Sequence, residues 1–211
     1  MFDSLNIFKK PENSQLSESL DQLSKNYLSS SASKKIREAV DFANKAHEGQ
    51  FRKSGEPFIT HPINVGLILV SLKMDVDTVI AGLLHDVVED CDIPLSDVKK
   101  NFGNDVSQLV DGVTKLLQLD EKMKDQSQAE HFQKMALATA EDVRVVIIKL
   151  ADRLHNLKTI EHLPREKQIK KCRETFDLYA PLAHQIGMHK MATELEDCSF
   201  KTLHPIRYKL I

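Results

Sequence analysis

The 211-residue chain has little glycine or proline, few aromatic residues and no tryptophan. Glycine and proline number seven each, and aromatic residues make up 6% of the chain. Because glycine and proline punctuate helices and turns, their scarcity together with apolar residues spaced three to four apart predicts helix almost throughout. We therefore expect an all-α fold, with at most a small β-hairpin near residues 50–59.

Long hydrophobic runs are also missing, since no apolar stretch approaches the roughly 18 residues of a membrane-spanning helix. The amino-terminal sequence MFDSLNIFKKPENS lacks the apolar core of a secretory signal. Hydrophobic residues at 41% and charged residues at 28% are ordinary for a soluble globular protein. We expect a cytoplasmic protein with no membrane partner.

Excess charge and paired cysteines are absent as well. A formal net charge of -2 gives no general attraction to nucleic acid, so an anionic ligand would need a local cluster of bases. The three cysteines, Cys91, Cys172 and Cys198, are an odd number without C-x-x-C spacing. This argues against a disulfide framework and against a thiolate zinc site, and we expect three reduced thiols.

Most of the chain is expected to form one domain. Residues 1–30 are polar, and at most the part around Leu16 to Leu28 is expected to form a helix at the domain edge. Residues 31–211 would then be the domain proper with its C-terminal helices. Ser33 is a suitable cap for its first helix, and the polar stretch 118–130 is expected to be an exposed loop.

The stretch AGLLHDVVEDC carries four ionisable residues in an otherwise apolar helical pattern. On one continuous helix, His85 would stack beside Glu89 and Asp86 beside Asp90, so that all four line one broad stripe. Buried and unpaired carboxylates are costly and repel one another, which indicates that a cation is needed. A divalent metal ion satisfies both requirements.

A mixed set of imidazole and carboxylate ligands suits Mn²⁺, Fe²⁺ or Zn²⁺ better than Ca²⁺ or Mg²⁺. His85 and Asp86 would supply two ligands, and His61, after a loop, and Asp152, in an apolar helix, are the best placed to complete the set. Glu89 and Asp90 would then remain near the metal to orient and deprotonate a water molecule.

Each of these residues has an ordinary structural explanation when it is taken alone. A single histidine in a helix is usually a satisfied core residue, Asp90 suits a surface position, and His47 with Glu48 is only a helix end. Three features together favour function: the H-D-x-x-E-D pattern, a His-Pro after a basic glycine loop, and an aspartate within IIKLADRLHNL.

Two further groups are candidates for ligand contacts. A short basic loop precedes Gly55 and suits a phosphate or a purine ring, although on its own it is more typical of a solvated turn. Polar residues that follow Asp152 on the same helix face could bond a ligand beside the metal, whereas Arg153 and His155 could be structural. The candidate contacts are Arg52, Lys53, Ser54, Asn156 and Thr159.

The segments HEGQFRKSGEPFITHP, GLLHDVVED and IIKLADRLHN resemble the HD-type hydrolase domain of the RelA/SpoT homologues, over about residues 36–200. The resemblance implies an HD-domain helical bundle that hydrolyses guanosine 3',5'-bis(diphosphate) (ppGpp) or pppGpp to GDP or GTP and pyrophosphate. It also implies nucleotide contacts by the five residues named above. Finally, it implies one Mn²⁺ held by His61, His85, Asp86 and Asp152, with Glu89 and Asp90 activating water that attacks the phosphorus on the ribose 3' oxygen.

The C-terminal segment ETFDLYAPLAHQIGMHKMATELEDCSF resembles the helices that link hydrolase and synthetase domains in the long homologues. The chain stops about where a synthetase would begin, so synthesis is not expected. Around MHKMATELED it also lacks the tryptophan of the more usual pattern. We expect a stand-alone small alarmone hydrolase, and a fragment of a longer bifunctional protein is the alternative.

Two other functions stay open. The same chemistry could act on another nucleotide, such as an adenosine alarmone or a nicotinamide dinucleotide phosphate. A non-catalytic nucleotide sensor is the rival from a different class, and such a domain would be expected to lose a ligand or the Glu-Asp pair, neither of which is missing. A nucleotide is the expected partner in every case, and the oligomeric state is left open.

Overall fold

The computed structural model describes residues 13–122 and 141–210, which divide into two compact units at residues 118 and 119. No strand occurs among the described residues, which confirms the all-α prediction. The expected hairpin is reduced to one isolated bridge between Phe51 and Pro57. The helices are α1 (Asn13–Lys25), α2 (Ser30–Ala46), α3 (Thr60–Ser71), α4 (Val76–Leu84), α5 (Val87–Asp90), α6 (Leu95–Phe102), α7 (Asn104–Lys122), α9 (Val143–Lys158), η2 (Ile160–His162), α10 (Arg165–Glu174), η3 (Thr175–Tyr179), α11 (Ala180–Gln185), α12 (His189–Leu203) and α13 (Pro205–Tyr208).

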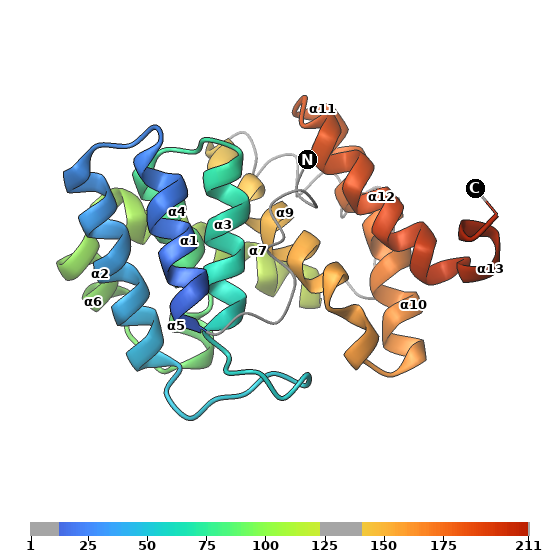
Figure 1. Ribbon diagram of the computed structural model, residues 1–211, viewed down its shortest axis with the longest axis horizontal. Helices are drawn as coiled ribbons and strands as arrows, with labels where there is room; N and C mark the ends of the chain where they lie inside the picture. Colours follow the sequence, from blue (N-terminus) through green and yellow to red (C-terminus); the bar gives the residue numbers. More distant parts are fainter. Residues whose placement is uncertain (1–12, 123–140, 211) are drawn as a thin grey trace. The chain divides into compact units, whose positions relative to one another are not determined.

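The first unit is built around α3, which packs against α1 and α4, while α2 packs against α1 and α4 (Figure 1). Nearly the whole circumference of α3 is buried, as its sequence THPINVGLILVS predicts for a helix with neighbours on all sides. At Gly82 an added Cβ would overlap the side chain of Leu69 on α3. The close approach of α3 and α4 therefore depends on this glycine.

Helix α1 covers part of this core and lies within the segment that the sequence assigned to the polar N-terminus. Leu16 and Leu20 are buried, and Asp21 pairs with Arg37 of α2. A helix was expected around residues 16–28, and it begins and ends three residues earlier.

Ser29, not Ser33, caps α2 by accepting a hydrogen bond from the Ala32 amide at 3.2 Å, so the expected cap is wrong. Ser33 lies inside the helix, buried, with Ser24 Oγ 3.5 Å from its hydroxyl oxygen. The nearby residues Ser29, Ser30, Ser31 and Ser33 are all suitable caps by type, and burial inside the helix rules out Ser33.

The stretch 118–130, expected to be a loop, is helical at its start, because α7 extends to Lys122. The remainder, from residue 123 onward, lies outside the described residues. The three cysteines are free thiols, as expected.

The second unit contains α9, which packs on α12, and α12 also packs on α10, η3 and α11. Asp142 caps α9 by accepting from the Arg144 amide at 2.9 Å. Segment η3 is a π-helix that runs directly into α11, which has Pro181 in its first turn. Gly187, at a φ of 79°, makes the turn between α11 and α12.

Candidate metal centre

The helix that was expected to carry His85, Asp86, Glu89 and Asp90 is broken in the middle. Helix α4 ends at Leu84 and α5 begins at Val87, so the prediction of one continuous helix is wrong. Nδ1 of His85 lies 2.8 Å from the carbonyl oxygen of Gly82, which the Asp86 amide would bond in a regular helix. Asp86 has φ -97° and ψ -11°, at the edge of the helical region.

His61, His85 and Asp86 nevertheless converge. One ligand atom from each lies within 4.8 Å of the others. The Asp86 carboxylate is 3.5 Å from His61 Nε2 through Oδ2 and 3.0 Å from His85 Nε2 through Oδ1. Both imidazoles are buried, and Asp86 is half-buried. Two nitrogens and one carboxylate around one point are a donor set that suits a transition metal.

The hydrogen bond of His85 supports this interpretation. A backbone carbonyl can only accept, so Nδ1 donates to it and Nε2 is left facing Asp86. Metal-bound histidines commonly have their other nitrogen fixed in this way. The residues present therefore fit a divalent metal ion.

His61 reaches this place because it stands in the first turn of α3. Thr60 N donates to the Pro57 carbonyl at 3.1 Å and His61 N donates to the Phe58 carbonyl at 2.9 Å, which fixes the turn that enters the helix. His61 was expected to follow a loop, and this is confirmed.

Asp152 lies in α9 of the second unit and is buried there, as its apolar surroundings predicted. Lys149 Nζ lies 3.1 Å from Oδ2 and donates to it, while Asn156 Nδ2 donates to Oδ1 at 2.5 Å. Asn156 therefore shares the face of Asp152, as expected. The contribution of Lys149 was not predicted, because a lysine in an apolar helix usually extends to solvent.

Thr159 caps the C-terminal end of α9, and its hydroxyl donates to the His155 carbonyl at 3.2 Å. Arg153 is structural in this unit, as the sequence suggested. Its guanidinium is buried, bonds Glu174 at 2.9 Å and lies 4.0 Å from the centre of the Tyr179 ring.

Glu89 and Asp90 occupy the single turn of α5 and keep contact with solvent. Partial burial raises the pKa of Asp90 above its ordinary value, and the charge of Asp86 adds to the rise, while His47 and His85 oppose it. A raised pKa moves a carboxyl toward the range in which it can exchange protons near neutral pH.

The basic loop between α2 and α3 forms a tight turn (Figure 1). Arg52 N donates to the Glu56 carbonyl at 2.8 Å, and Gly55 N donates to the Arg52 carbonyl at 2.9 Å. Gly55 has a φ of 83°, which favours glycine. Lys53 is exposed, and the Ser54 hydroxyl donates to Glu56 at 3.3 Å.

His47 was interpreted as only a helix end, but it is buried and stacks on Phe58, with ring centres 4.5 Å apart. Asn64, three residues after His61 on α3, is also buried. The sequence contains one hint for these two residues, which is that each is a polar residue close to an apolar helical pattern and to a candidate site residue.

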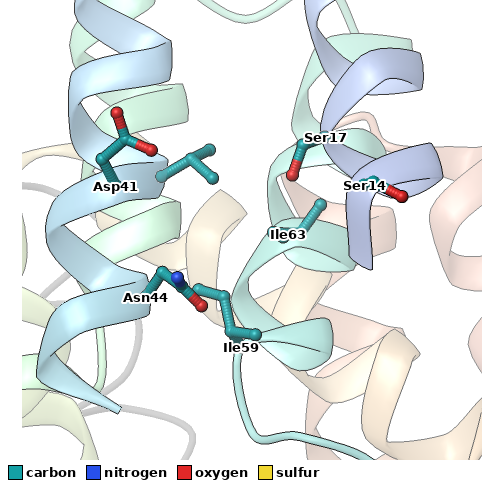
Figure 2. A pocket seen from close by; sticks show the side chains of 7 residues that line it. Ser14, Ser17, Asp41, Asn44, Ile59 and Ile63 are labelled. Carbon is teal, nitrogen blue, oxygen red and sulfur yellow. The ribbon is translucent and has the colours of Figure 1, made fainter. Parts of the chain in front are cut away.

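A separate shallow pocket of about 190 Å³ opens where α1, α2 and the start of α3 meet (Figure 2). None of its lining residues is a candidate site residue. They are Ser14, Ser17, Val40, Asp41, Asn44, Ile59 and Ile63. Across residues 13–122 and 141–210, every helix is too short or too polar to pass through a lipid bilayer.

Comparison with known proteins gives a consistent result. A protein of Escherichia coli K12 named bifunctional (p)ppGpp synthase/hydrolase SpoT is 47% identical over 196 residues, which are 93% of this chain and 28% of that protein. A Streptomyces coelicolor protein named GTP pyrophosphokinase is 51% identical over 181 residues, 86% of this chain and 21% of its own length. The chain thus spans about a quarter of these relatives.

A solved structure described as a metazoan ortholog of SpoT that hydrolyses ppGpp matches with a TM-score of 0.58 and 28% identity. The match covers 86% of this chain and 98% of that one. These relatives confirm the resemblance to RelA/SpoT homologues. The family model for the HD domain matches residues 39–189, which include all the candidate ligands, and on this ground the chain belongs to the HD domain family.

Proposed function

We propose that this chain is a guanosine 3',5'-bis(diphosphate) 3'-pyrophosphohydrolase, which converts ppGpp and pppGpp to GDP or GTP and pyrophosphate. The observation that carries the proposal is the convergence of His61, His85 and Asp86 in an HD domain. Relatives named for this hydrolysis are 45–47% identical to the chain. Since the substrate is a guanine nucleotide, we place the activity in the cytoplasm.

In this proposal the metal ligands are His61, His85, Asp86 and Asp152, and the ion is Mn²⁺. The two nitrogens favour a transition metal over Ca²⁺ or Mg²⁺. When bound, such an ion lowers the pKa of water and stabilises negative charge on a phosphoryl oxygen. Asp152 supports the assignment chemically, because it is a buried carboxylate whose two oxygens are both held by side-chain donors.

The carboxylates of α5 activate the attacking water molecule. Glu89 and Asp90 orient one water molecule and accept a proton from it, and the raised pKa of Asp90 suits this role. The water oxygen forms a bond to the phosphorus on the ribose 3' oxygen. The bond from that phosphorus to the 3' oxygen breaks, the 3' oxygen takes up a proton, and pyrophosphate leaves.

The basic loop and the end of α9 hold the nucleotide. Arg52 offers a planar guanidinium that can pair with phosphate or stack on guanine, and Lys53 adds a mobile positive charge. Ser54, Asn156 and Thr159 supply hydrogen-bonding groups. The turn closed by the Arg52 and Gly55 backbone hydrogen bonds supports the first half of this assignment, because it holds the loop in one conformation.

The test is to incubate purified protein with Mn²⁺ and ppGpp and to separate the products by anion-exchange chromatography. We expect GDP and pyrophosphate in equal amounts and no free phosphate. A panel with adenosine and nicotinamide nucleotides in the same assay reveals another substrate. Binding of ppGpp without turnover would support a sensor and contradict the proposal.

A further inference from the structure

A small polar network joins the C-terminal ends of α2 and α5 in the first unit. His47 Nδ1 lies 2.9 Å from Gln50 Oε1, and Gln50 Nε2 donates to the backbone carbonyl of Asp90 at 3.3 Å. Cys91 Sγ lies 3.2 Å from His47 Nδ1 and 3.8 Å from Gln50 Nε2. The network thus connects residues 40 or more positions apart in the chain.

The direction of these hydrogen bonds is fixed by the groups themselves. The Asp90 carbonyl can only accept, so the NH2 side of the Gln50 amide must face it. The amide oxygen then faces His47, whose Nδ1 must carry the proton that it donates. Gln50 is therefore held in a single orientation between the two helix ends.

Burial and ring stacking hold His47 in place within this network. It is 3% exposed and lies parallel to Phe58, with an interplanar angle of 26°. Phe58 follows the basic loop, so the network borders that loop on both sides. Helix α5 has only four residues, and its last carbonyls lie beyond the reach of intrahelical donors. Gln50 supplies one of the missing donors.

We propose that Gln50, oriented by His47, is a positioning residue that fixes the end of α5, and with it Glu89 and Asp90, relative to the loop of Arg52, Lys53 and Ser54. The inference rests on the proposed function, because it gives Gln50 a part in that reaction. Gln50 acts through the main chain of Asp90. Its loss displaces the carboxylates without removing any of them.

Two variants test the proposal. Gln50→Ala removes both hydrogen bonds, whereas Gln50→Glu keeps the size and the oxygen facing His47 but places an oxygen against the Asp90 carbonyl. Because a misplacement of about 1 Å can lower a rate roughly 100-fold, we expect kcat to fall about 10- to 100-fold in both variants. The KM for ppGpp should change by less than about threefold, since groups that bind the ground state are unchanged. The affinity for Mn²⁺, measured by calorimetry, should stay as it is.

Gln168 in the second unit provides a matched control. It is also half-buried, its Nε2 donates to the Leu163 carbonyl at 2.8 Å, and its Oε1 accepts from Arg165 at 3.1 Å. Gln168→Ala removes the same kinds of bond and should keep kcat and KM. A comparable loss of kcat in this control would mean that the effect of Gln50 is not specific to α5.

Normal kcat in Gln50→Glu, or a loss of Mn²⁺ affinity together with kcat, would overturn the inference. If Gln50→Ala does not fold, the comparison of Gln50→Glu with the unmodified protein decides alone. Failure of the unmodified protein to hydrolyse ppGpp would refute the proposed function and this inference together. A working enzyme with unaffected Gln50 variants would refute this inference only.

Discussion

The two ring nitrogens of His85 have different roles. Nδ1 bonds the Gly82 carbonyl, while Nε2 faces Asp86. Glu89 and Asp90 lie after the break in the helix, on a separate turn. At the scale of single residues, the groups that suit metal ligation are therefore separated from the groups that suit proton transfer, and substitutions should separate the two roles as well.

Glu89→Gln should keep the affinity for Mn²⁺ and ppGpp and lose rate. Glutamine has nearly the shape of glutamate but cannot accept the proton. General-base catalysis typically contributes about 10²- to 10⁴-fold to a rate, so we expect kcat to fall by that factor. Asp152→Ala should instead abolish Mn²⁺ binding. Calorimetry with Mn²⁺ and the pyrophosphate assay check both, and equal metal loss in the two variants would contradict this division of roles.

At the scale of the helices, the sequence predicted which segments are helical and buried better than it predicted where each helix begins and ends. The buried run around Asp152 was visible because apolar residues surround it in the sequence, at Ile147, Ile148, Leu150, Ala151 and Leu154. The break at His85 was not visible, because the spacing of apolar residues does not show that the His85 side chain hydrogen-bonds the Gly82 carbonyl. The role of His47 was missed for a related reason, since its contact with Cys91 comes from a residue 44 positions away and its stacking on Phe58 crosses the loop between them.

Gly82→Ala should weaken the packing of α4 on α3. The new methyl group would overlap Leu69, and overpacking a well-filled core costs about 1–3 kcal/mol in free energy of unfolding. Gly66→Ala is the control, because its added carbon would lie 3.0 Å from the nearest atom, Cδ2 of Leu83, and should cost less. Urea unfolding measures both, and equal losses would be inconsistent with this packing.

Glu174→Gln should destabilise the junction of α9 and α10. Burial alone would raise the pKa of Glu174, but the charge of Arg153 and its hydrogen bond outweigh burial and lower the pKa below the ordinary 4.5. The carboxylate therefore contributes stability above pH 4.5, and this contribution is lost as the pH falls through the lower native pKa.

We expect Glu174→Gln to cost about 1–3 kcal/mol near neutral pH, because it leaves the buried guanidinium of Arg153 without its charged partner while Glu174 itself is half-buried. Thermal unfolding between pH 3 and pH 7 should show the difference from the unmodified protein shrinking toward the acidic end. The exposed pair of Lys34 and Glu38 on α2 provides the comparison, and Glu38→Gln should have little effect. A difference for Glu174→Gln that does not depend on pH would argue against the ion pair.

At the scale of the whole molecule, a metal ion held by the proposed ligands should stabilise the native chain. An ion that binds only the native chain stabilises it by about 2.7 kcal/mol at a concentration of 100 times its Kd. Mn²⁺ should therefore raise Tm, and a chelator should reverse the rise. His61→Ala should remove the shift, and an unchanged shift in this variant would exclude His61 as a ligand.

The pairing of Lys149 with Asp152 bears on the order of assembly. The ammonium group already balances this carboxylate inside α9, so the metal-free polypeptide does not hold an isolated negative charge there. Small zinc domains, by contrast, stay unfolded until their ion arrives. We therefore expect newly made chains to reach the native state before a metal ion binds.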